Sequence, residues 1–428
     1  MKSVGILGGG QLAKLLSLSA KNLDLKVWVL SPSKQDPAGQ NNPYWIKGDP
    51  HSLTDLKKFL TNKDILSFES EFFSAKQIKK ALKPKSSLFI APSLNNLKNI
   101  QDRAYQKKLL KKHHIPTTDF VPVEFKTRQS GQKKLLNLWS QWGAFVLKSR
   151  MGGYDGYGTF VIKKKSHIKQ IKLPQTNFIA EKLIPFKREL ALLSARNKKG
   201  QIVFFPLVES FQEKSTCLWV KGPAQHKKLK SLKTQIKKFL SHIDYQGVIA
   251  FELFDTHSNL IVNELAPRVH NTGHYSLDAL TEDQFSLHLK AISNQTLKTP
   301  RLKYKAFAML NLLGEGAKKP SFKKRSLLDK ACQSQLYRSG LNFQHDLFRL
   351  PPEDRNSRDD SHSRESGNLR KKQENSNRIR IKKEKISLYW YGKTESRIGR
   401  KMGHLNSAGS SGKQALNKLL KLRPFFKI

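Results

Sequence analysis

The order of elements at the start of the chain constrains the fold more than any other feature. Val4-Gly-Ile-Leu7 predicts a buried strand, Gly8-Gly-Gly10 a tight turn, and residues 11–21 an amphipathic helix. Lys26-Val-Trp-Val-Leu30 predicts a second strand. Together they form a βαβ unit, which is typical of a parallel sheet covered by helices.

The glycine turn also matches a dinucleotide-binding fingerprint, because Gly8, Gly10 and Ala13 have its spacing. That fingerprint requires an acidic residue at the end of the second strand. Ser31-Pro-Ser33 stands there instead. We therefore disfavour NAD as a ligand.

Later segments extend this α/β start. Apolar runs at 64–69 and 88–91 predict further parallel strands, and a helical pattern runs from about 95 to 114 before Pro116. From about 117 the strands are longer and separated by turn residues, which indicates an α+β region.

We expect three domains: a Rossmann-like domain at 1–94, a second domain at 95–295, and a small β-rich C-terminal domain at 296–428. Residues 318–385 interrupt the last one. Their centre, from Pro351 to Lys372, has few apolar residues and dense charge of both signs. We predict a basic, disordered insert, with an RNA-binding arm as the alternative.

The composition indicates a cytoplasmic protein. The 428 residues include 79 Lys and Arg against 33 Asp and Glu, a formal charge of +46. This excess is scattered along the chain, which favours a solvated surface over a nucleic-acid stripe. Cys217 and Cys332 match no metal-binding or disulfide spacing. No run approaches the length of a membrane span.

Two glutamates are the best candidates for metal binding. Apolar runs at 247–254 and 260–264 flank the turn-like segment Thr256-His-Ser-Asn259, so they predict a hairpin. Its symmetry places Glu252 and Glu264 nearly opposite each other. Facing carboxylates are destabilising unless a cation lies between them, and Mg²⁺ prefers such ligands. The alternative is two solvated glutamates.

The stretch from Lys148 to Phe160 contains four glycines directly after an apolar run. It could be a plain hairpin turn, or a loop whose backbone N–H groups cover phosphate, with the Lys148 ammonium standing over the same phosphate. The alternating segment Ile179–Ile184 could likewise hold an adenine ring or form an ordinary edge strand.

Two polar clusters complete the candidates. The first is the loop Asn263–His274, which carries an acid, an arginine, two histidines and asparagines. The second, Tyr391–His404, is rich in cations that suit a small acidic substrate, although a solvated turn would read the same way. Polar loops after buried strands are more often functional than structural.

The ordered set of motifs resembles the ATP-grasp superfamily and, within it, the family of 5-(carboxyamino)imidazole ribonucleotide synthases. The motifs are Gly8-Gly-Gly-Gln-Leu12, Gln101-Asp-Arg103, Gly152-Gly-Tyr-Asp-Gly156, Asn263-Glu-Leu-Ala-Pro-Arg-Val-His-Asn271 and Gly399-Arg-Lys-Met-Gly-His404.

The resemblance implies an ATP-grasp fold with a Rossmann-like pre-ATP-grasp domain at 1–94 and a glycine-loop lid in the domain at 95–295. It implies Mg²⁺ at Glu252 and Glu264. It also implies that ATP is bound by Arg103, Lys148, Gly153, Tyr154, Asp155, Gly156, Tyr157, Gly158, Thr159, Glu181, Lys182, Leu183, Ile184, Glu189, Gln212, Asn263 and Glu264.

The activity implied is carboxylation of aminoimidazole ribonucleotide by bicarbonate and ATP, through carboxyphosphate, by a homodimer in purine biosynthesis. The catalytic positions implied are Arg268, His270, Asn271 and Lys393. The substrate-binding positions implied are Glu69, Tyr154, Asp155, Arg268, Lys393 and Arg400.

The chain departs from the family pattern at several points. Tyr157 replaces a basic residue of the lid, Gln212 replaces a histidine, and Ser67-Phe-Glu-Ser-Glu71 replaces the usual TYEFE. Two alternatives therefore stay open: an ATP-grasp ligase with another acceptor, and a non-catalytic nucleic-acid-binding derivative of the fold.

Overall fold

The structure is a computed structural model. It describes the chain except for residues 41, 126, 154–155, 172–176, 214, 317–320 and 323–385. The predicted insert at 318–385 therefore lies outside the described residues apart from Ser321 and Phe322, which form the short strand β17. Within the described part of the chain, no helix combines the length and the apolar character needed to cross a membrane.

The N-terminal βαβ prediction is confirmed. A parallel sheet has the order β3-β2-β1-β4-β5. Leucines of α1 pack on one face with α10, and side chains of α2 and α3 pack on the other. The elements are β1 (Lys2–Leu7), α1 (Gln11–Ala20), β2 (Leu25–Ser31), β3 (Trp45–Lys47), α2 (Leu53–Leu60), β4 (Ile65–Phe68), α3 (Ala75–Ala81) and β5 (Phe89–Ile90).

The single helical pattern predicted from 95 to 114 is wrong in one respect, because the structure has two helices, α4 (Leu94–Gln101) and α5 (Arg103–Lys112). Asp102 separates them in an extended conformation. Its carboxylate accepts from the Ala104 backbone N–H at 2.9 Å and so caps α5. The break turns Arg103 toward the glycine loop, where its backbone N–H donates to Arg150 O at 2.9 Å.

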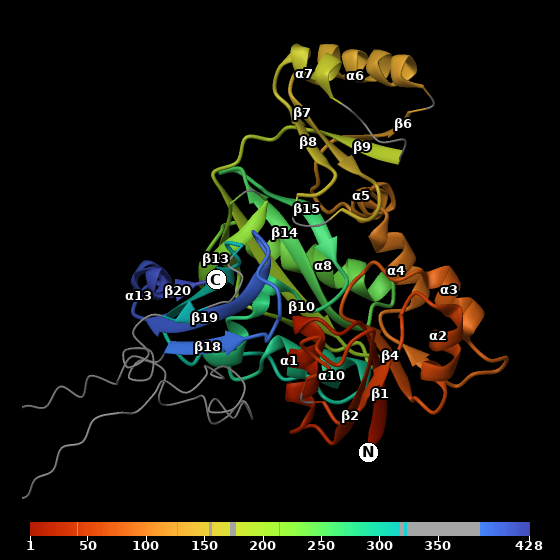
Figure 1. Cartoon of the computed structure of the whole chain (residues 1–428). Coiled ribbons are helices and arrows are strands. Elements are labelled where there is room, and N and C mark those ends of the chain that lie inside the picture. Colours follow the sequence, from red (N-terminus) through yellow and green to blue (C-terminus); the bar gives the residue numbers. More distant parts are fainter. Residues whose placement is uncertain are drawn as a thin grey trace, which may run out of the picture.

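A small antiparallel sheet stands apart from the body of the molecule at the top of Figure 1, with α6 and α7 on one face. Its order is β6-β9-β7-β8. β9 is thus an inner strand, which answers the edge-strand alternative for residues 179–182. The elements are β6 (Phe120–Glu124), α6 (Arg128–Trp142), β7 (Phe145–Ser149), β8 (Thr159–Ile162), α7 (Lys165–Gln170) and β9 (Asn177–Lys182).

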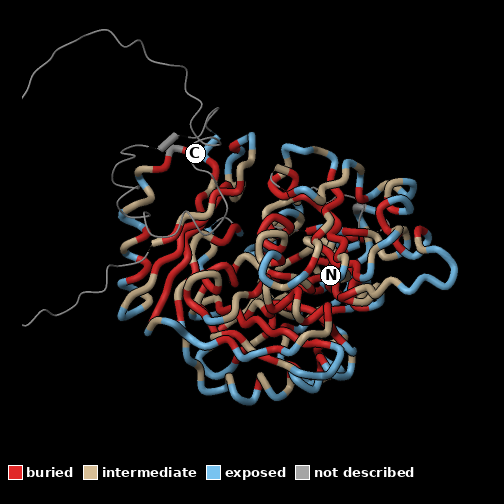
Figure 2. Tube along the Cα trace, turned by 90° about the horizontal axis from the view of Figure 1, so that it is seen from below, coloured by how far each residue is buried: buried red, intermediate tan, exposed pale blue. Residues whose placement is uncertain are grey.

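The central sheet has the order β15-β14-β10-β12-β13-β16-β19-β18, and β11 pairs with β10. Figure 2 shows that buried residues run through the interior of the molecule. The elements up to residue 292 are β10 (Arg188–Arg196), β11 (Ile202–Phe204), β12 (Val208–Glu213), β13 (Thr216–Gly222), α8 (Leu229–His242), β14 (Gly247–Asp255), β15 (Leu260–Ala266), η1 (Asn271–Gly273), α9 (Ser276–Ala279) and α10 (Gln284–Ile292).

The C-terminal strands extend this central sheet, because β16 pairs with β13. The domain boundaries at 94 and 295 stay a prediction. The remaining elements are β16 (Ala306–Leu313), β17 (Ser321–Phe322), β18 (Ile386–Trp390), β19 (Lys401–Gly409), α13 (Gly412–Leu422), η3 (Arg423–Phe425) and β20 (Phe426–Lys427).

Candidate active site

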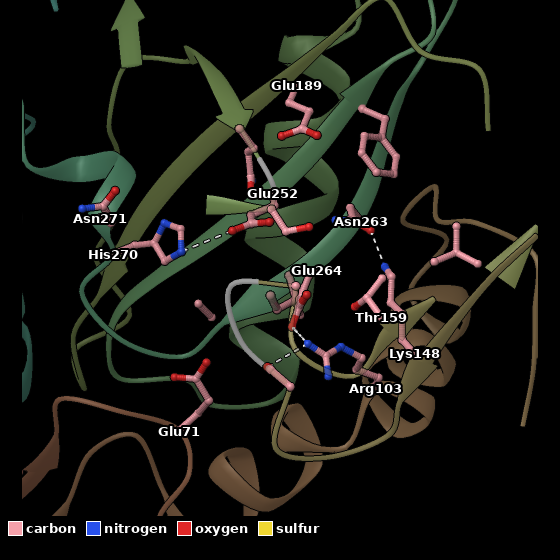
Figure 3. Close-up of a pocket in the computed structure, with 18 of the residues that line it drawn as sticks. Glu71, Arg103, Lys148, Thr159, Glu189, Glu252, Asn263, Glu264, His270 and Asn271 are labelled. Carbon is pink, nitrogen blue, oxygen red and sulfur yellow. Dashed lines mark hydrogen bonds and ion pairs between the residues drawn. The ribbon is translucent and has the colours of Figure 1, made fainter. Parts of the chain in front are cut away.

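A cavity of about 610 Å³ lies where the sheets meet (Figure 3). Its walls come from the ends of β1 and β4, the glycine loop, β14 and β15, and the loop after β15. Most of the predicted site residues line it: Glu69, Arg103, Lys148, Gly153, Gly156, Thr159, Glu181, Lys182, Leu183, Ile184, Glu189, Gln212, Glu252, Asn263, Glu264, Arg268, His270 and Asn271.

The predicted carboxylate hairpin is confirmed. Glu252 on β14 lies opposite Glu264 on β15, next to a register shift, and the turn is closed by Thr256 N–H donating to Asn259 O at 3.1 Å. Each carboxylate has a side-chain partner from outside the hairpin. The Nε2 of His270 lies 3.3 Å from Glu252 Oε1, and Arg103 Nη2 lies 2.8 Å from Glu264 Oε1.

The electrostatics keep Glu252 ionised. Burial alone would raise its pKa, but the hydrogen bond and charge of His270 and the charges of Lys148 and Arg268 outweigh it, so the pKa falls below its usual value. The described residues contain no group of three or more His, Cys, Asp or Glu that could hold a metal. Mg²⁺ needs only one or two carboxylates when phosphates supply the other ligands, so the pair fits that ion.

Lys148 is the last but one residue of β7, and its ammonium is held at the cavity wall. Its Nζ donates to Asn263 Oδ1 at 2.8 Å and lies 3.2 Å from Glu181 Oε2. Figure 3 shows Lys148 of β7 pointing toward Asn263 of β15, with Glu264 of the same strand close by. A cation placed here can meet phosphate oxygens beside the carboxylate pair.

The glycine loop is anchored by Arg103. Its Nη2 donates to Gly153 O at 3.0 Å and its Nη1 donates to Ser149 O at 2.9 Å. A Cβ on Gly153 would lie 2.7 Å from Arg103 Nη1, so glycine permits the contact. Gly156 has φ +81°, and a Cβ there would overlap Ser215. The loop therefore packs against the turn between β12 and β13, over the cavity. The predicted residues Tyr154 and Asp155 lie outside the described residues.

Lys107 is a buried residue behind the cavity wall that sequence reasoning missed; it does not line the cavity but contacts Glu181, which does. Its Nζ lies 3.2 Å from Glu181 Oε2 and donates to Thr118 Oγ1 at 2.8 Å. Burial lowers its pKa to about 8. Glu181 is also desolvated, but Lys148, Lys107 and a hydrogen bond from Thr118 lower its pKa to about 2. The group thus holds Glu181 as an anion and fixes the position of Lys148.

Glu189 on β10 is set apart from the other carboxylates. Burial, followed by the charge of Glu252, raises its pKa to about 7, while a hydrogen bond from Gln212 acts in the opposite direction. Gln212 thus contacts Glu189, one of the residues predicted to bind ATP. The side-chain amide of Gln212 does not titrate, so it can donate a hydrogen bond to Glu189 at any pH.

Glu69 lines the cavity and binds the turn at the start of α1. Its two carboxylate oxygens accept from Gly10 N at 2.7 Å and from Ala13 N at 3.2 Å. A Cβ on Gly8 would come within 2.5 Å of Glu69 Oε1. The amides that a dinucleotide would require are occupied by the chain's own carboxylate, in agreement with the rejection of NAD.

Arg268 pairs with Glu71, a second residue that sequence reasoning did not assign to the site. Arg268 Nη2 donates to Glu71 Oε1 at 3.1 Å, and Nε donates to Oε2. Burial opposes the ionised pair, but the charge of Arg268 lowers the pKa of Glu71 and the charge of Glu71 raises the pKa of Arg268. The one sequence signal was the acidic run after β4.

Four predicted residues do not line the cavity: Tyr157, Gly158, Lys393 and Arg400. Tyr157 is 73% exposed. The Nζ of Lys393 donates to Lys401 O at 2.7 Å, and its charge acts on Glu69. Arg400 Nη1 donates to Glu395 O at 3.0 Å. Lys401, a member of the predicted cationic cluster that was not singled out as a site residue, lines the cavity instead.

Three domain families match the chain. The ribonucleotide synthetase preATP-grasp domain matches residues 1–101, the ATP-grasp domain matches 108–285, and the phosphoribosylaminoimidazole carboxylase C-terminal domain matches 366–418. With a cavity lined by a glycine lid, a lysine and a facing carboxylate pair, these matches define an ATP-grasp protein.

The relatives narrow this class. The N5-carboxyaminoimidazole ribonucleotide synthase of Staphylococcus aureus (strain COL) is 32% identical over 316 residues, 73% of this chain and 82% of the relative. The enzyme of that name from Synechococcus elongatus is 29% identical over 423 residues, 97% of this chain and 92% of the relative. The chain belongs to the N5-carboxyaminoimidazole ribonucleotide synthase family.

Solved structures agree. That of N5-carboxyaminoimidazole ribonucleotide synthetase from Thermotoga maritima has a TM-score of 0.76 at 27% identity and covers 100% of this chain and 99% of its own. That of the Staphylococcus aureus synthetase, complexed with ADP, has a TM-score of 0.74 at 26% identity and covers 99% of this chain and 97% of its own.

Proposed function

We propose that this cavity is the site at which the chain, as a member of its family, carboxylates 5-aminoimidazole ribonucleotide with bicarbonate and ATP in purine biosynthesis. The products are 5-carboxyamino-1-(5-phosphoribosyl)imidazole, ADP and phosphate. One observation carries the assignment of the site. The facing pair Glu252 and Glu264 lies between a phosphate-side lysine, Lys148, and the polar loop of Arg268 and His270, all on one cavity.

The nucleotide end of the site comprises Lys148, Arg103, the glycine loop, the segment 181–184, Glu189, Gln212 and Asn263. Lys148 and Arg103 neutralise phosphate oxygens, and the lid covers them. Glu252 and Glu264 would hold Mg²⁺, which supplies charge neutralisation for the transferring phosphoryl group. Arg103 contacts Glu264 through Nη2 and would stand beside the phosphates that the glycine loop covers, since its five N–H donors allow more than one anionic partner.

The carboxylation end comprises Arg268, His270 and Asn271, with Glu69 near the bicarbonate. The family resemblance adds Lys393 and Arg400 on the ribonucleotide side, although neither lines the cavity in this structure. A bicarbonate oxygen attacks the γ-phosphorus of ATP, and the bond to ADP breaks. The amine nitrogen of the ribonucleotide then attacks the carbonyl carbon of carboxyphosphate, and phosphate and a proton leave. Positioning and charge carry both steps, since neither needs a covalent intermediate with the protein. Closing the lid protects the mixed anhydride from water.

The test is the substrate dependence of ADP release from purified protein. Release that requires both bicarbonate and aminoimidazole ribonucleotide supports the assignment. Turnover with another acceptor and without bicarbonate would favour a different ATP-grasp ligase. Tight RNA binding with a steep salt dependence, and no ATP hydrolysis, would favour the nucleic-acid-binding alternative.

The remaining parts of the proposal are a homodimer, which the family resemblance supports, and a cytoplasmic location, which the composition supports. Light scattering of the purified chain tests the first. A monomer at the concentration used for full activity would contradict it.

A further inference from the structure

We propose that Asn311 is a positioning residue that fixes the side-chain amide of Asn271, so that one N–H of Asn271 faces the cavity. The proposal rests on the proposed function, which places Asn271 at the carboxylation end. Asn311 itself does not line the cavity. It acts through Asn271 alone.

Asn311 is the one polar residue in the strand Ala306–Leu313 and is fully buried. Because side chains alternate along a strand, it shares a face with Phe307 and Met309, which belong to the main core. A buried amide that lacks partners costs about 1–3 kcal/mol. An apolar residue would avoid that cost, so the amide at this position needs a reason.

Its hydrogen bonds supply one. Asn311 Nδ2 donates to the backbone oxygen of Cys217 at 2.8 Å and to Asn271 Oδ1 at 2.7 Å. In return, Asn271 Nδ2 donates to Asn311 Oδ1 at 3.0 Å. The two amides thus form a reciprocal pair between β16 and the loop after β15.

The contact with Cys217 sets the orientation of both amides. A backbone carbonyl only accepts, so the atom of Asn311 that faces it must be the nitrogen. Its second hydrogen then requires an acceptor, which is Asn271 Oδ1. Asn271 has no freedom to exchange its oxygen and nitrogen without placing two donors, and two acceptors, against each other.

The consequence lies in the cavity. Asn271 donates one N–H to Asn311, and among the described residues the other N–H has no hydrogen-bond partner. The side chain is half-buried in the cavity wall with Arg268 and His270. Bicarbonate and carboxyphosphate present oxygen acceptors. A fixed N–H stabilises them, whereas an amide that turned its oxygen toward them would repel them.

The first experiment compares Asn311→Leu with Asn406→Leu in full-length protein. Asn406 is a matched control, since it is also a buried asparagine, on the neighbouring strand β19. It donates to His274 O at 3.0 Å and to Asp278 Oδ2 at 2.8 Å, and makes no bond to Asn271. Both variants should lose similar thermal stability.

Only Asn311→Leu should raise the bicarbonate KM or lower kcat, by about tenfold, the loss of one hydrogen bond to a charged group. The KM for ATP should change less than about twofold, because the nucleotide end is untouched. If the leucine variant does not fold, Asn311→Ser replaces it, since the shorter hydroxyl side chain cannot make both donations.

The second experiment is a double-mutant cycle with Asn271→Ala. If Asn311 acts through Asn271, adding Asn311→Leu to Asn271→Ala leaves the bicarbonate kinetics unchanged. Effects that multiply, or wild-type bicarbonate kinetics in Asn311→Leu, overturn the proposal. Failure of the proposed function would be seen in a different measurement: the wild-type protein would release ADP without needing bicarbonate or ribonucleotide. The cycle measured on unfolding free energies then still decides whether the two amides are coupled.

Discussion

Glu252 and Glu264 face each other across β14 and β15, and each has its own side-chain partner, His270 for Glu252 and Arg103 for Glu264. The pair is therefore ready to bind a divalent ion without depending on it for folding. Loss of either carboxylate should therefore reduce the metal-dependent activity more than the stability of the fold.

Replacing Glu264 by alanine should reduce Mg²⁺-dependent ADP release by at least about a hundredfold, because charge stabilisation at the transferring phosphoryl group is worth several kcal/mol. The rate is measured over a range of Mg²⁺ concentrations. Glu209→Ala is the control, since Glu209 pairs with Arg188 and Lys221 and does not line the cavity. Near-normal activity in Glu264→Ala would refute the metal assignment.

Two glycines of the glycine loop allow a matched test. Both have a positive φ, but they differ in the room available for a Cβ atom. Gly156 has φ +81° and a Cβ there overlaps Ser215, whereas Gly152 has φ +74° and nothing within 4 Å. Gly156→Ala should weaken ATP binding more than Gly152→Ala, by roughly tenfold, because the overlap costs about 1–3 kcal/mol. Titration calorimetry measures both.

A compensating change tests whether the overlap is the cause. Ser215→Gly removes the side chain that Gly156→Ala meets, so the double variant should bind ATP like Gly152→Ala. An equally weak double variant would mean that the lid does not close against the turn between β12 and β13.

We expect substitution of Tyr157 to change the KM for ATP only slightly, although this residue departs from the family pattern. Because its side chain is 73% exposed and does not line the cavity, Tyr157→Lys should change the KM for ATP by less than about threefold. Exposed charges are strongly screened. Steady-state kinetics at low and high salt check this, and a tenfold gain at both would place the side chain over the phosphates.

Protonation of buried histidines should limit stability in acid. His288 Nδ1 accepts from the Val248 N–H at 3.1 Å, and the other ring nitrogen lies 2.9 Å from Ser67 Oγ, so the ring is neutral. Burial lowers its pKa to about 4 and that of His404 to about 3. An unfolded histidine titrates near 6.5. The stability contribution of each group is thus complete above 6.5 and falls as the pH drops toward the folded pKa.

For His288 this loss amounts to about 3 kcal/mol between pH 6.5 and 4. It is measured by urea unfolding of the wild type and of His288→Asn, which keeps hydrogen-bonding groups but does not titrate. The wild-type curve should fall more steeply with decreasing pH. Parallel curves would show that His288 is not the group responsible.

The sequence carried enough information for the hairpin and for the position of Lys148 beside the glycine loop, because both are local; that the loop covers phosphate stays a prediction. Glu252 and Glu264 are related by the symmetry of one turn, and Lys148 adjoins its loop directly. Residues that only the tertiary fold brings to the cavity or its wall could not be predicted in this way. Lys107 lies on a helix among other lysines, and Asn311 interrupts an apolar strand. The signal available for Asn311 was its polarity in that strand.

A local cap explains the one wrong helix, and strand pairing explains why Lys401 lines the cavity. The side chain of Asp102 ends one helix and starts another within a pattern that has continuous helical periodicity. Lys393 and Arg400 match their motif, but the pairing of β16 with β19 brings Lys401 to the cavity. Spacing in a motif fixes neighbours, whereas strand pairing decides which neighbour faces the site.

The bonds of Glu69 to the turn before α1 have a consequence for annotation by motif. A strand, a glycine triplet and a helix match the pattern of a cofactor-binding turn. Here, however, the carboxylate of Glu69 already accepts from the backbone N–H groups that a pyrophosphate would use. A carboxylate at the end of the adjacent parallel strand is the counter-signal. In this chain that carboxylate distinguishes the glycine turn before α1 from a turn that binds the pyrophosphate of a dinucleotide.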